Sequence, residues 1–450
     1  MATEIFRSYD IRGIVGKNLN EDVAKNIGKA FGTYLQGEED VVVGMDMRVS
    51  SESLKKFFIS GLTSTGCNII DIGMVATPIV YFAIIFLEKN AGACVTASHN
   101  PPEWNGFKLR GKNAVGLSYD KELKEIEKIF LSKKFLKSKN GIITQKEMRK
   151  AYVNKMTSKI KIERKLKVVL DIGNGMGGIA ETIYRNLGCD VISLYKEPNG
   201  RFPHHIADPS LPETLEKLQK KVVSEKADIG IAFDGDCDRV GFVDNRGRIV
   251  SNDVVFSIFA RHVLNKNKNA SVICDIRTPM NVIKEIERLG GNVIITKAGS
   301  VYVMNKLIET NGVLAGEMSG HFWLGNEWFN IDDAIFSGAK MLEIISSSKN
   351  SFARIVDEIP KSYFIPSKKI PCPDEKKEKV MKKLIDKLEK KYSVLKIDGA
   401  KIIEDDWSIL IRPSRTEPKI EFVVESKKND VNKIYKNFEK IVKDLLKSRS

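Results

Sequence analysis

The sequence predicts an α/β protein, with three similar α/β domains that have mainly parallel mixed sheets and a smaller C-terminal α+β domain. Strand-like and helix-like segments alternate at the spacing of βαβ units, which favours mainly parallel sheets. Three apolar strands that begin at Gly92, Gly230 and Gly312 each lead into a polar loop, which indicates one α/β unit repeated three times. The pattern near the end of the chain is shorter. We therefore expect domains at 1–150, 151–250, 251–366 and 367–450.

The composition indicates a folded globular protein. Hydrophobic residues make up 42% of the 450 residues and charged residues 29%, so disorder is not expected. The net charge of +15 comes largely from lysines along helix-like segments such as 376–391 and 427–447. Aromatic residues are not interleaved there, as a stacking platform for bases would require. We therefore interpret the positive charge as a solvated surface and expect no nucleic-acid partner.

No segment has the pattern of a membrane anchor or a secretion signal. The first seven residues, MATEIFR, lack the basic and then apolar layout of a signal peptide, and the apolar stretch 73–87 is too short to span a bilayer. The six cysteines lie far apart, without the spacing of a zinc or redox motif. We expect reduced cysteines in a cytoplasmic protein that does not bind membranes and is a monomer or a homodimer.

The first domain supplies the clearest periodicities. Helices are expected over 21–35 and 50–65, and strands over 41–44 and 68–71. The apolar stretch 73–87 fits a buried loop and a helix, with Thr77 as N-cap and Pro78 at the first helical position.

A hydroxyl residue is placed at the end of the next strand, 93–95. It lies in the loop 96–101, TASHNP, which the proline keeps out of both helix and strand, so Ser98 is expected on a stiff, exposed loop. A further strand over 104–109 forms a hairpin with the first and brings Lys108 beside the hydroxyl. The alternatives are an ordinary turn and a surface lysine.

The start of the chain, 6–13, contains two arginines, a tyrosine and a glycine. Arg12 and Tyr9 either lean into an anionic site or belong to a surface turn, and the local sequence does not decide between these two interpretations.

An acidic loop directly follows the apolar strand 229–233 of the second domain. Asp234, Asp236 and Asp238 alternate after an apolar strand, so in extended geometry their carboxylates point to one side and repel each other unless a cation lies between them. Oxygen ligands alone favour Mg²⁺ or Mn²⁺ over zinc. A calcium EF-hand does not fit, because Arg239 and Asn245 stand at its sixth and twelfth positions.

The third domain is expected to restart at 251–253, which looks like a cap for a helix over 254–264. Its polar loop contains Glu317 and Ser319, which could bind vicinal sugar hydroxyls or could belong to a simple glycine turn. Upstream, Lys297 is a candidate anion ligand.

The C-terminal domain contains a basic loop, 412–419. Arg412, Ser414, Arg415 and Thr416 combine two guanidinium groups with two hydroxyls in a tight turn, which is typical of a phosphate-binding loop. An ordinary basic turn is the alternative.

Taken in order, these loops resemble those of the α-D-phosphohexomutases, the family of phosphomannomutases and phosphoglucomutases. The motifs are YDIRG at 9–13 with the serine loop 96–101, the acidic loop 234–239, GEMSGH at 316–321 and RPSRTEP at 412–418. The resemblance covers nearly the whole chain and implies four domains around a central cleft. Two positions depart from common members: Arg415 stands where Gly or Asn is usual, and Ser300 where some mannose-acting members have His.

The resemblance also implies roles for the loop residues. Ser98 would carry a phosphoryl group, and one Mg²⁺ would be held by Asp234, Asp236, Asp238 and a phosphoserine oxygen. Lys108, Arg12 and Arg239 would lie near the transferring group, and Lys108 or His99 would exchange the hydroxyl proton. Glu317 and Ser319 would hold sugar hydroxyls, Arg412, Ser414 and Thr416 the phosphate that does not react, and Tyr9, Lys297, His321 and Arg415 would complete the substrate site.

The activity that the resemblance implies is interconversion of hexose 1-phosphate and hexose 6-phosphate, with glucose or mannose 1,6-bisphosphate as activator. The sugar phosphate is the expected partner. Phosphoglucosamine mutase activity is the main alternative. A metal-dependent sugar phosphatase and a nucleic-acid-binding protein are more distant ones, and the second leaves the acidic and serine loops unexplained.

Overall fold

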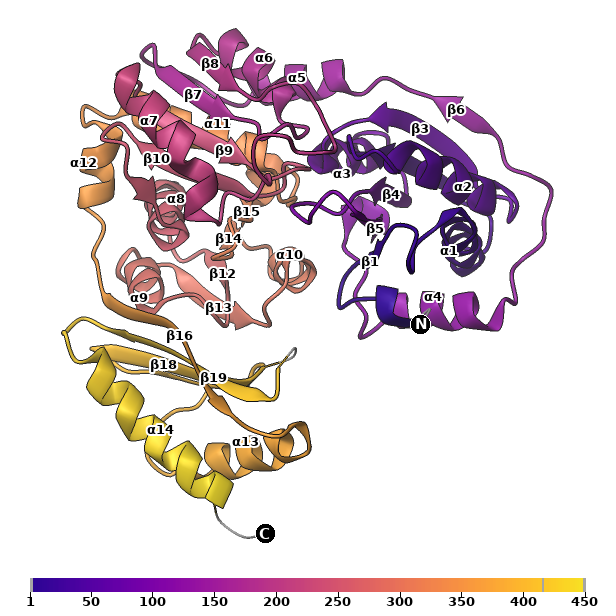
Figure 1. Cartoon of the computed structure of the whole chain (residues 1–450). Helices are drawn as coiled ribbons and strands as arrows, with labels where there is room; N and C mark the ends of the chain where they lie inside the picture. Colours follow the sequence, from indigo (N-terminus) through magenta and orange to yellow (C-terminus); the bar gives the residue numbers. More distant parts are fainter. Residues whose placement is uncertain (1–2, 415–416, 448–450) are drawn as a thin grey trace.

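The computed structural model describes residues 3–414 and 417–447, which form four β-sheets with helices packed against them (Figure 1). The first three sheets contain parallel strands and an antiparallel neighbour, and the fourth is antiparallel throughout. The predicted fold class is therefore confirmed. No helix in the described part of the chain is both long and apolar enough to cross a bilayer.

The first sheet has the strand order β1-β5-β4-β2-β3-β6. Its strands are β1 (Ile11–Ile14), β2 (Asp40–Met45), β3 (Asn68–Met74), β4 (Ala91–Val95), β5 (Trp104–Arg110) and β6 (Ile143–Gln145), and its helices are η1 (Thr3–Ile5), α1 (Glu21–Tyr34), α2 (Ser51–Thr63), α3 (Thr77–Phe86), η2 (Lys112–Ala114), α4 (Glu122–Ser132) and α5 (Arg149–Thr157). Helix α1 begins where predicted, because the Asn20 side chain accepts a hydrogen bond from the amide of Val23 at 2.9 Å.

The second sheet has the order β11-β10-β9-β7-β8. Its elements are β7 (Lys167–Asp171), α6 (Gly178–Asn186), β8 (Asp190–Leu194), η3 (Pro212–Leu215), α7 (Glu216–Ser224), β9 (Ile229–Phe233), β10 (Val240–Asp244) and β11 (Ile249–Val250).

The third sheet has the order β13-β12-β14-β15. Its elements are α8 (Asn252–Lys266), β12 (Ser271–Asp275), α9 (Met280–Arg288), β13 (Asn292–Thr296), α10 (Ser300–Glu309), β14 (Leu314–Gly316), β15 (Phe322–Trp323), η4 (Gly325–Trp328), α11 (Ala334–Ser347) and α12 (Phe352–Asp357). Helix α8 starts two residues earlier than predicted, and its N-cap residue Ser251 makes no capping hydrogen bond through its side chain.

The three α/β sheets share one arrangement, as the repeated glycine-led strands predict. In each sheet, two parallel strands flank a central one, and a fourth, antiparallel strand follows as a hairpin. The hairpins are β4–β5, β9–β10 and β14–β15. The residues between their strands are the serine loop, the acidic loop and the loop 317–321, called the sugar loop below after its expected role; the three loops are thus equivalent positions of one repeated unit.

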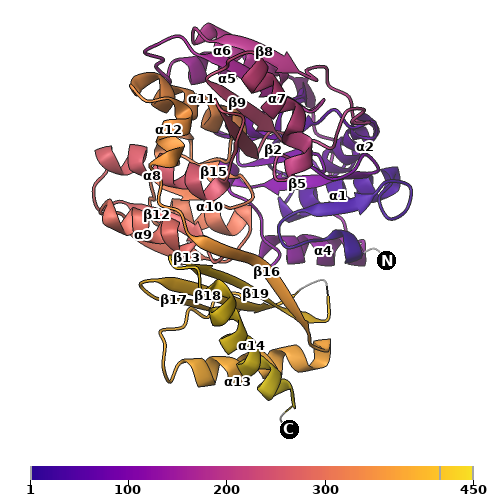
Figure 2. The same cartoon turned by 60° about the vertical axis from the view of Figure 1, so that its left-hand side comes forward.

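The C-terminal domain is a separate layer. Its sheet, β16-β19-β18-β17, contains β16 (Tyr363–Pro371), β17 (Ala400–Ile403), β18 (Trp407–Pro413) and β19 (Lys419–Ser426), covered by α13 (Asp374–Leu388) and α14 (Val431–Lys447). It has a hydrophobic core of its own, whereas a single core extends from helix α3 of the first domain through the second and third sheets. Figures 1 and 2 show this domain against the third one, away from the first.

Polar side chains fasten the C-terminal domain to the third. The buried Lys401 ammonium donates to the carbonyls of Ile276 (2.8 Å) and Thr278 (2.5 Å), and Glu425 accepts from the first amides of α9. The domain boundaries themselves stay predictions. Strand β16 spans residues on both sides of the predicted boundary between residues 366 and 367.

Candidate active site

The serine loop follows β4, and the side chain of Arg48 binds its main-chain carbonyls. Arg48 donates to the carbonyls of Ser98 (2.8 Å), Asn100 (2.6 Å), Pro101 (2.7 Å) and Trp104 (3.0 Å). Ser98 has φ +53° and is only 2% exposed. The expectation that Ser98 lies on an exposed loop is therefore wrong. The hydrogen bonds from the Arg48 guanidinium to the loop carbonyls hold Ser98 in a buried position. The Ser98 side chain nevertheless lines a cavity.

Within the described part of the chain, two groups contact the Ser98 hydroxyl. It donates to Asp234 Oδ2 at 2.6 Å, and His99 Nδ1 lies 3.0 Å from its Oγ. Burial and the nearby charge of Arg239 lower the pKa of His99, so its imidazole is neutral at neutral pH. The hydroxyl thus lies between a carboxylate and a neutral imidazole.

The three acidic residues converge in the turn of the β9–β10 hairpin. Carboxylate oxygens of Asp234, Asp236 and Asp238 lie within 4.8 Å of one another, and all three residues are buried. The expected extended alternation is wrong, since Cys237 has φ +67° and its amide donates back to the Asp234 carbonyl at 3.2 Å. A tight turn, not strand geometry, brings the carboxylates together.

Lys108 offsets part of this negative charge. Its ammonium lies 2.7 Å from Asp236 Oδ2 and also bonds Asp238. Burial opposes the charged form of Lys108, but the two carboxylates outweigh it and raise its pKa well above the usual value. Burial, reinforced by Asp238 and Asp236, also raises the pKa of Asp234 well above its usual range.

Thr77 provides a further contact to the acidic loop. It is the first helical residue of α3, and the N-cap is Ala76, so the predicted capping role is wrong. Its hydroxyl donates instead to Asp236 Oδ2 at 2.6 Å, while its amide donates to the Asp236 carbonyl at 2.9 Å.

The residues fit a divalent cation with oxygen ligands. Asp236 Oδ1 and Asp238 Oδ1 are buried and have no hydrogen-bond partner among the described residues. Burying such carboxylate oxygens costs free energy unless a cation neutralises their charge. The atoms that could coordinate a cation here are all oxygens. The acidic loop is therefore a candidate metal site.

Arginines and aromatic residues line the rest of the cavity, which has a volume of about 400 Å³. Arg12 in β1 donates to Asn100 Oδ1 at 2.6 Å and pairs with Asp10. The predicted residues that line the cavity are Tyr9, Arg12, Ser98, His99, Lys108, Asp238, Arg239 and His321. The structure thus brings the start of the chain, the serine loop, the acidic loop and part of the sugar loop to one place.

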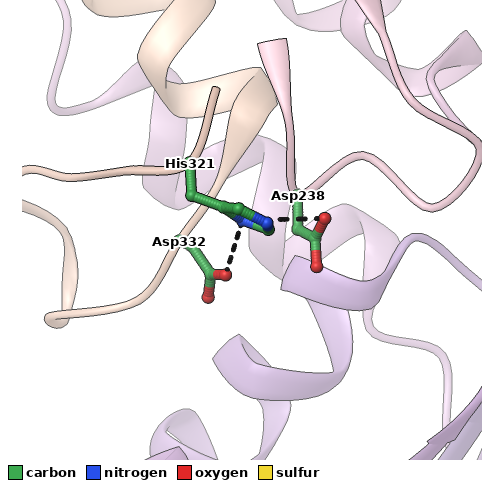
Figure 3. Close-up of side chains that lie close together, drawn as sticks. All are labelled: Asp238, His321 and Asp332. Carbon is green, nitrogen blue, oxygen red and sulfur yellow. Dashed lines mark ion pairs between the residues drawn. The ribbon is translucent and has the colours of Figure 1, made fainter. Parts of the chain in front are cut away.

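His321 connects the sugar loop to the acidic loop (Figure 3). Its Nε2 accepts a hydrogen bond from Arg239 Nε at 3.0 Å, and its Nδ1 lies 3.0 Å from Asp332 Oδ2 and 3.8 Å from Asp238 Oδ1. The Trp323 ring stacks near the imidazole, with centroids 5.8 Å apart. All three domains of the repeat therefore contribute side chains to this cavity.

Glu317 and Ser319 lie side by side, and their side chains form hydrogen bonds with other groups of the protein. Ser319 Oγ donates to Glu317 Oε2 at 3.0 Å, and Glu317 Oε1 accepts from the amide of Gly299 at 2.7 Å. Gly299 has φ +129°, and a Cβ there would come within 3.0 Å of the Tyr9 ring. The sugar loop and the preceding loop are therefore packed against the start of the chain.

Lys297 does not line the cavity of Ser98. Its side chain is half-exposed and lies 3.2 Å from Asp120 Oδ2, across the border between the first and third domains.

The basic loop of the C-terminal domain lies apart from the serine. Arg412 lines a second cavity, of about 600 Å³, between the third and fourth domains, where it pairs with Glu421 at 2.8 Å. Ser414 accepts a hydrogen bond from Lys377 through its carbonyl at 2.7 Å. Arg415 and Thr416 lie outside the described residues. This structure therefore does not bring Arg412 into the serine cavity.

Sequence reasoning missed several residues in or beside the site. They are Asp46, Arg48, Arg110, which lines the cavity, Arg277, which pairs with Glu317 at 3.5 Å, and Asp332. Asp46 and Arg48 directly follow β2, at the same strand end as the serine loop, and this position was the available signal. Asp46 accepts from Thr96 Oγ1 at 2.8 Å and from Ser51 Oγ at 2.6 Å, so the two loops are joined.

The comparisons with known proteins all indicate the same family. A family model described as phosphoglucomutase/phosphomannomutase, alpha/beta/alpha domain I, matches residues 3–137, and the models of domains II and III match 150–247 and 251–363. A phosphomannomutase/phosphoglucomutase from Pseudomonas aeruginosa is 37% identical, with 93% of this chain and 90% of that protein covered. A probable phosphoglucosamine mutase from Pyrococcus abyssi is 38% identical, with 99% of each covered.

The solved structures agree with these matches. The crystal structure of a phosphoglucomutase/phosphomannomutase family protein from Burkholderia thailandensis superposes with a TM-score of 0.90 at 33% identity, covering 100% of this chain and 99% of the other. The fold and these similarities define an α-D-phosphohexomutase, which is an isomerase. The chain belongs to the phosphoglucomutase/phosphomannomutase family.

Proposed function

We propose that this enzyme interconverts hexose 1-phosphate and hexose 6-phosphate through a phosphorylated Ser98 and a hexose 1,6-bisphosphate. The contact between Ser98 Oγ and Asp234 Oδ2 carries the proposal, because it joins a hydroxyl of the first domain to an acidic cluster of the second. Arg12, Lys108 and Arg239 line the same cavity and supply the positive charge that a phosphoryl group requires.

Asp234, Asp236 and Asp238 would hold one Mg²⁺, together with an oxygen of phospho-Ser98. When bound, the cation offsets negative charge on the transferring phosphoryl group. The orphaned oxygens Asp236 Oδ1 and Asp238 Oδ1 support this assignment.

The transfer itself is assigned to groups of this chain. Phospho-Ser98 donates its phosphoryl group to the free sugar hydroxyl, and the other phosphate of the resulting bisphosphate later returns to Ser98. Lys108 or His99 exchanges the hydroxyl proton, and Arg12 and Arg239 orient the phosphoryl oxygens. The bisphosphate of glucose or mannose would act as activator, since it loads Ser98.

The two phosphates of the substrate need two binding places. Arg412, Ser414, Arg415 and Thr416 would bind the phosphate that does not react, with Tyr9, Lys297, Glu317, Ser319 and His321 around the sugar. Arg412 now lines the neighbouring cavity, so we infer that the C-terminal domain moves toward Ser98 when substrate binds.

The preferred sugar is tested by a coupled assay with glucose, mannose and glucosamine 1-phosphates, each with the matching bisphosphate. Glucose and mannose are the leading candidates because of the Pseudomonas aeruginosa relative, and glucosamine is the second because of the Pyrococcus abyssi relative. Conversion of any of these esters supports the mutase activity. Release of inorganic phosphate without isomerisation would indicate a phosphatase instead and would overturn the proposal.

A further inference from the structure

A buried carboxylate, that of Asp332, is linked through His321 to Arg239 of the acidic loop. Asp332 is 1% exposed and faces His321 (Figure 3). His321 in turn contacts Arg239. We propose that Asp332 is a positioning residue: it holds His321 in the tautomer with the proton on Nδ1, so that Nε2 fixes Arg239 at the phosphoryl site. This inference rests on the proposed function of the cavity.

The first step is the direction of the hydrogen bond between Arg239 and His321. The guanidinium is protonated at all ordinary pH values and can only donate, so His321 Nε2, 3.0 Å from Arg239 Nε, must present a lone pair. The ring proton of a neutral imidazole then lies on Nδ1. This nitrogen is the one that faces Asp332 Oδ2 at 3.0 Å and Asp238 Oδ1 at 3.8 Å.

The second step is the environment of Asp332. Neither of its oxygens has a hydrogen-bond partner among the described residues, although Oδ2 is within ion-pair distance of His321 Nδ1. One positive charge near Asp332 is that of Arg110: burial opposes this charge, but Tyr81 and Asp332 outweigh it and raise the pKa of Arg110. A buried carboxylate with so few donors strongly favours a proton on the nitrogen that faces it. Asp332 therefore selects the tautomer that Arg239 requires.

The third step excludes a cation at this cluster. Asp238, His321 and Asp332 each offer a ligand atom within 4.8 Å of the others, which is also the arrangement of a metal site. A metal on His321 Nδ1 would require the lone pair there and would move the ring proton to Nε2. Two N–H groups would then face each other across the 3.0 Å contact with Arg239. The geometry points to a proton on Nδ1 instead.

The packing keeps the imidazole in this orientation. The Trp323 ring lies nearly parallel to it, with an interplanar angle of 25°, and His321 is 5% exposed. The ring therefore has little freedom, and the identity of the protonated nitrogen decides whether Arg239 is held or repelled.

The test is a double-mutant cycle in the full-length, Mg²⁺-loaded enzyme. Asp332→Asn removes the charge that selects the tautomer and should lower kcat about tenfold to a hundredfold, with a smaller change in KM. In an Arg239→Lys background, which lacks the Nε–H contact, the same substitution should lower kcat less than threefold further. The ring ¹⁵N shifts of His321, assigned with His321→Gln, should report protonated Nδ1 in the wild type and a mixture in Asp332→Asn.

Asp333 is the matched control. It is equally buried, but it binds Tyr152 and Trp328 and caps α11, so Asp333→Asn should lower the melting temperature without coupling to Arg239→Lys. Equal effects of Asp332→Asn in both backgrounds, unchanged ¹⁵N shifts, or a second bound metal that Asp332→Asn removes would each overturn the inference. A wild-type enzyme without mutase activity would instead refute the proposed function.

Discussion

Ser98 Oγ and Asp234 Oδ2 are 2.6 Å apart, although 136 residues separate them in the chain. The contact crosses from the serine loop of the first domain to the acidic loop of the second. It gives the hydroxyl an acceptor for its proton and places the oxygen that would be phosphorylated beside the candidate metal ligands. The chemistry proposed for the cavity depends on this pairing.

Ser98→Ala should lower turnover by at least about a thousandfold, because the variant has no oxygen to carry a phosphoryl group. The measurement is the coupled assay with bisphosphate activator, together with mass spectrometry of the intact chain after incubation with the bisphosphate. Ser60→Ala, an exposed position on α2, is the control and should behave as the wild type. Wild-type turnover in Ser98→Ala would remove Ser98 as the carrier.

Removal of divalent cations with a chelator should abolish activity, and added Mg²⁺ should restore it. Asp236→Asn should raise the Mg²⁺ concentration required for half-maximal activity at least tenfold, since the variant loses a charged ligand. Asp190→Asn, an exposed position at the start of β8, serves as control. If Asp236→Asn shows the same Mg²⁺ dependence as the wild type, the acidic loop does not hold the ion.

Arg48→Lys should lower both the melting temperature and kcat, the latter by about tenfold or more. A lysine cannot bond four carbonyls at once, and each buried carbonyl left without a donor costs about 1–3 kcal/mol. Arg149→Lys, where a surface arginine bonds one carbonyl, should change neither quantity appreciably. A thermally stable Arg48→Lys enzyme with full activity would show that the clamp does not set the serine loop.

The repeated fold and the site loops were predictable because apolar strands that end in polar residues leave a clear trace in the sequence. For Arg48 the only signal was its position after β2, since its partners are main-chain carbonyls, which every residue has. The convergence of the acidic residues was predicted for the wrong reason, because the positive φ of Cys237 is a property of the turn. Asp332 and Asp333 are adjacent and chemically identical, and only their tertiary contacts separate a site residue from a helix cap.

Lys401 should make the free energy of unfolding depend on pH in the alkaline range. Burial lowers the pKa of its ammonium to about 8, whereas an unfolded chain keeps the ordinary value of about 10.4. Between these values the unfolded state binds more protons, so this group makes the protein more stable as the pH rises.

Urea unfolding of the wild type and Lys401→Gln between pH 7 and 10.5 checks this expectation. The free-energy difference between wild type and variant should shift in favour of the wild type by on the order of 3 kcal/mol over this range. The comparison cancels the titration of the groups that both proteins share. A difference that stays constant with pH would show that Lys401 keeps its usual pKa at the border between the third and fourth domains.

Arg412→Ala should raise KM for the hexose phosphate about tenfold to a hundredfold and change kcat less. A guanidinium contributes charge-assisted hydrogen bonds to a phosphate, and the proposed place of Arg412 is at the phosphate that does not react. Arg412 pairs with Glu421 at 2.8 Å, so a phosphate bound by Arg412 must compete with this carboxylate.

The competition gives the prediction a second arm. Glu421→Gln removes the competing charge but keeps a similar side chain, and it should lower KM while Arg412→Ala raises it. Arg354→Ala, an exposed arginine on α12, controls for the loss of positive charge alone. An unaltered KM in Arg412→Ala would place the non-reacting phosphate elsewhere, because a phosphate that loses a guanidinium partner cannot bind equally well.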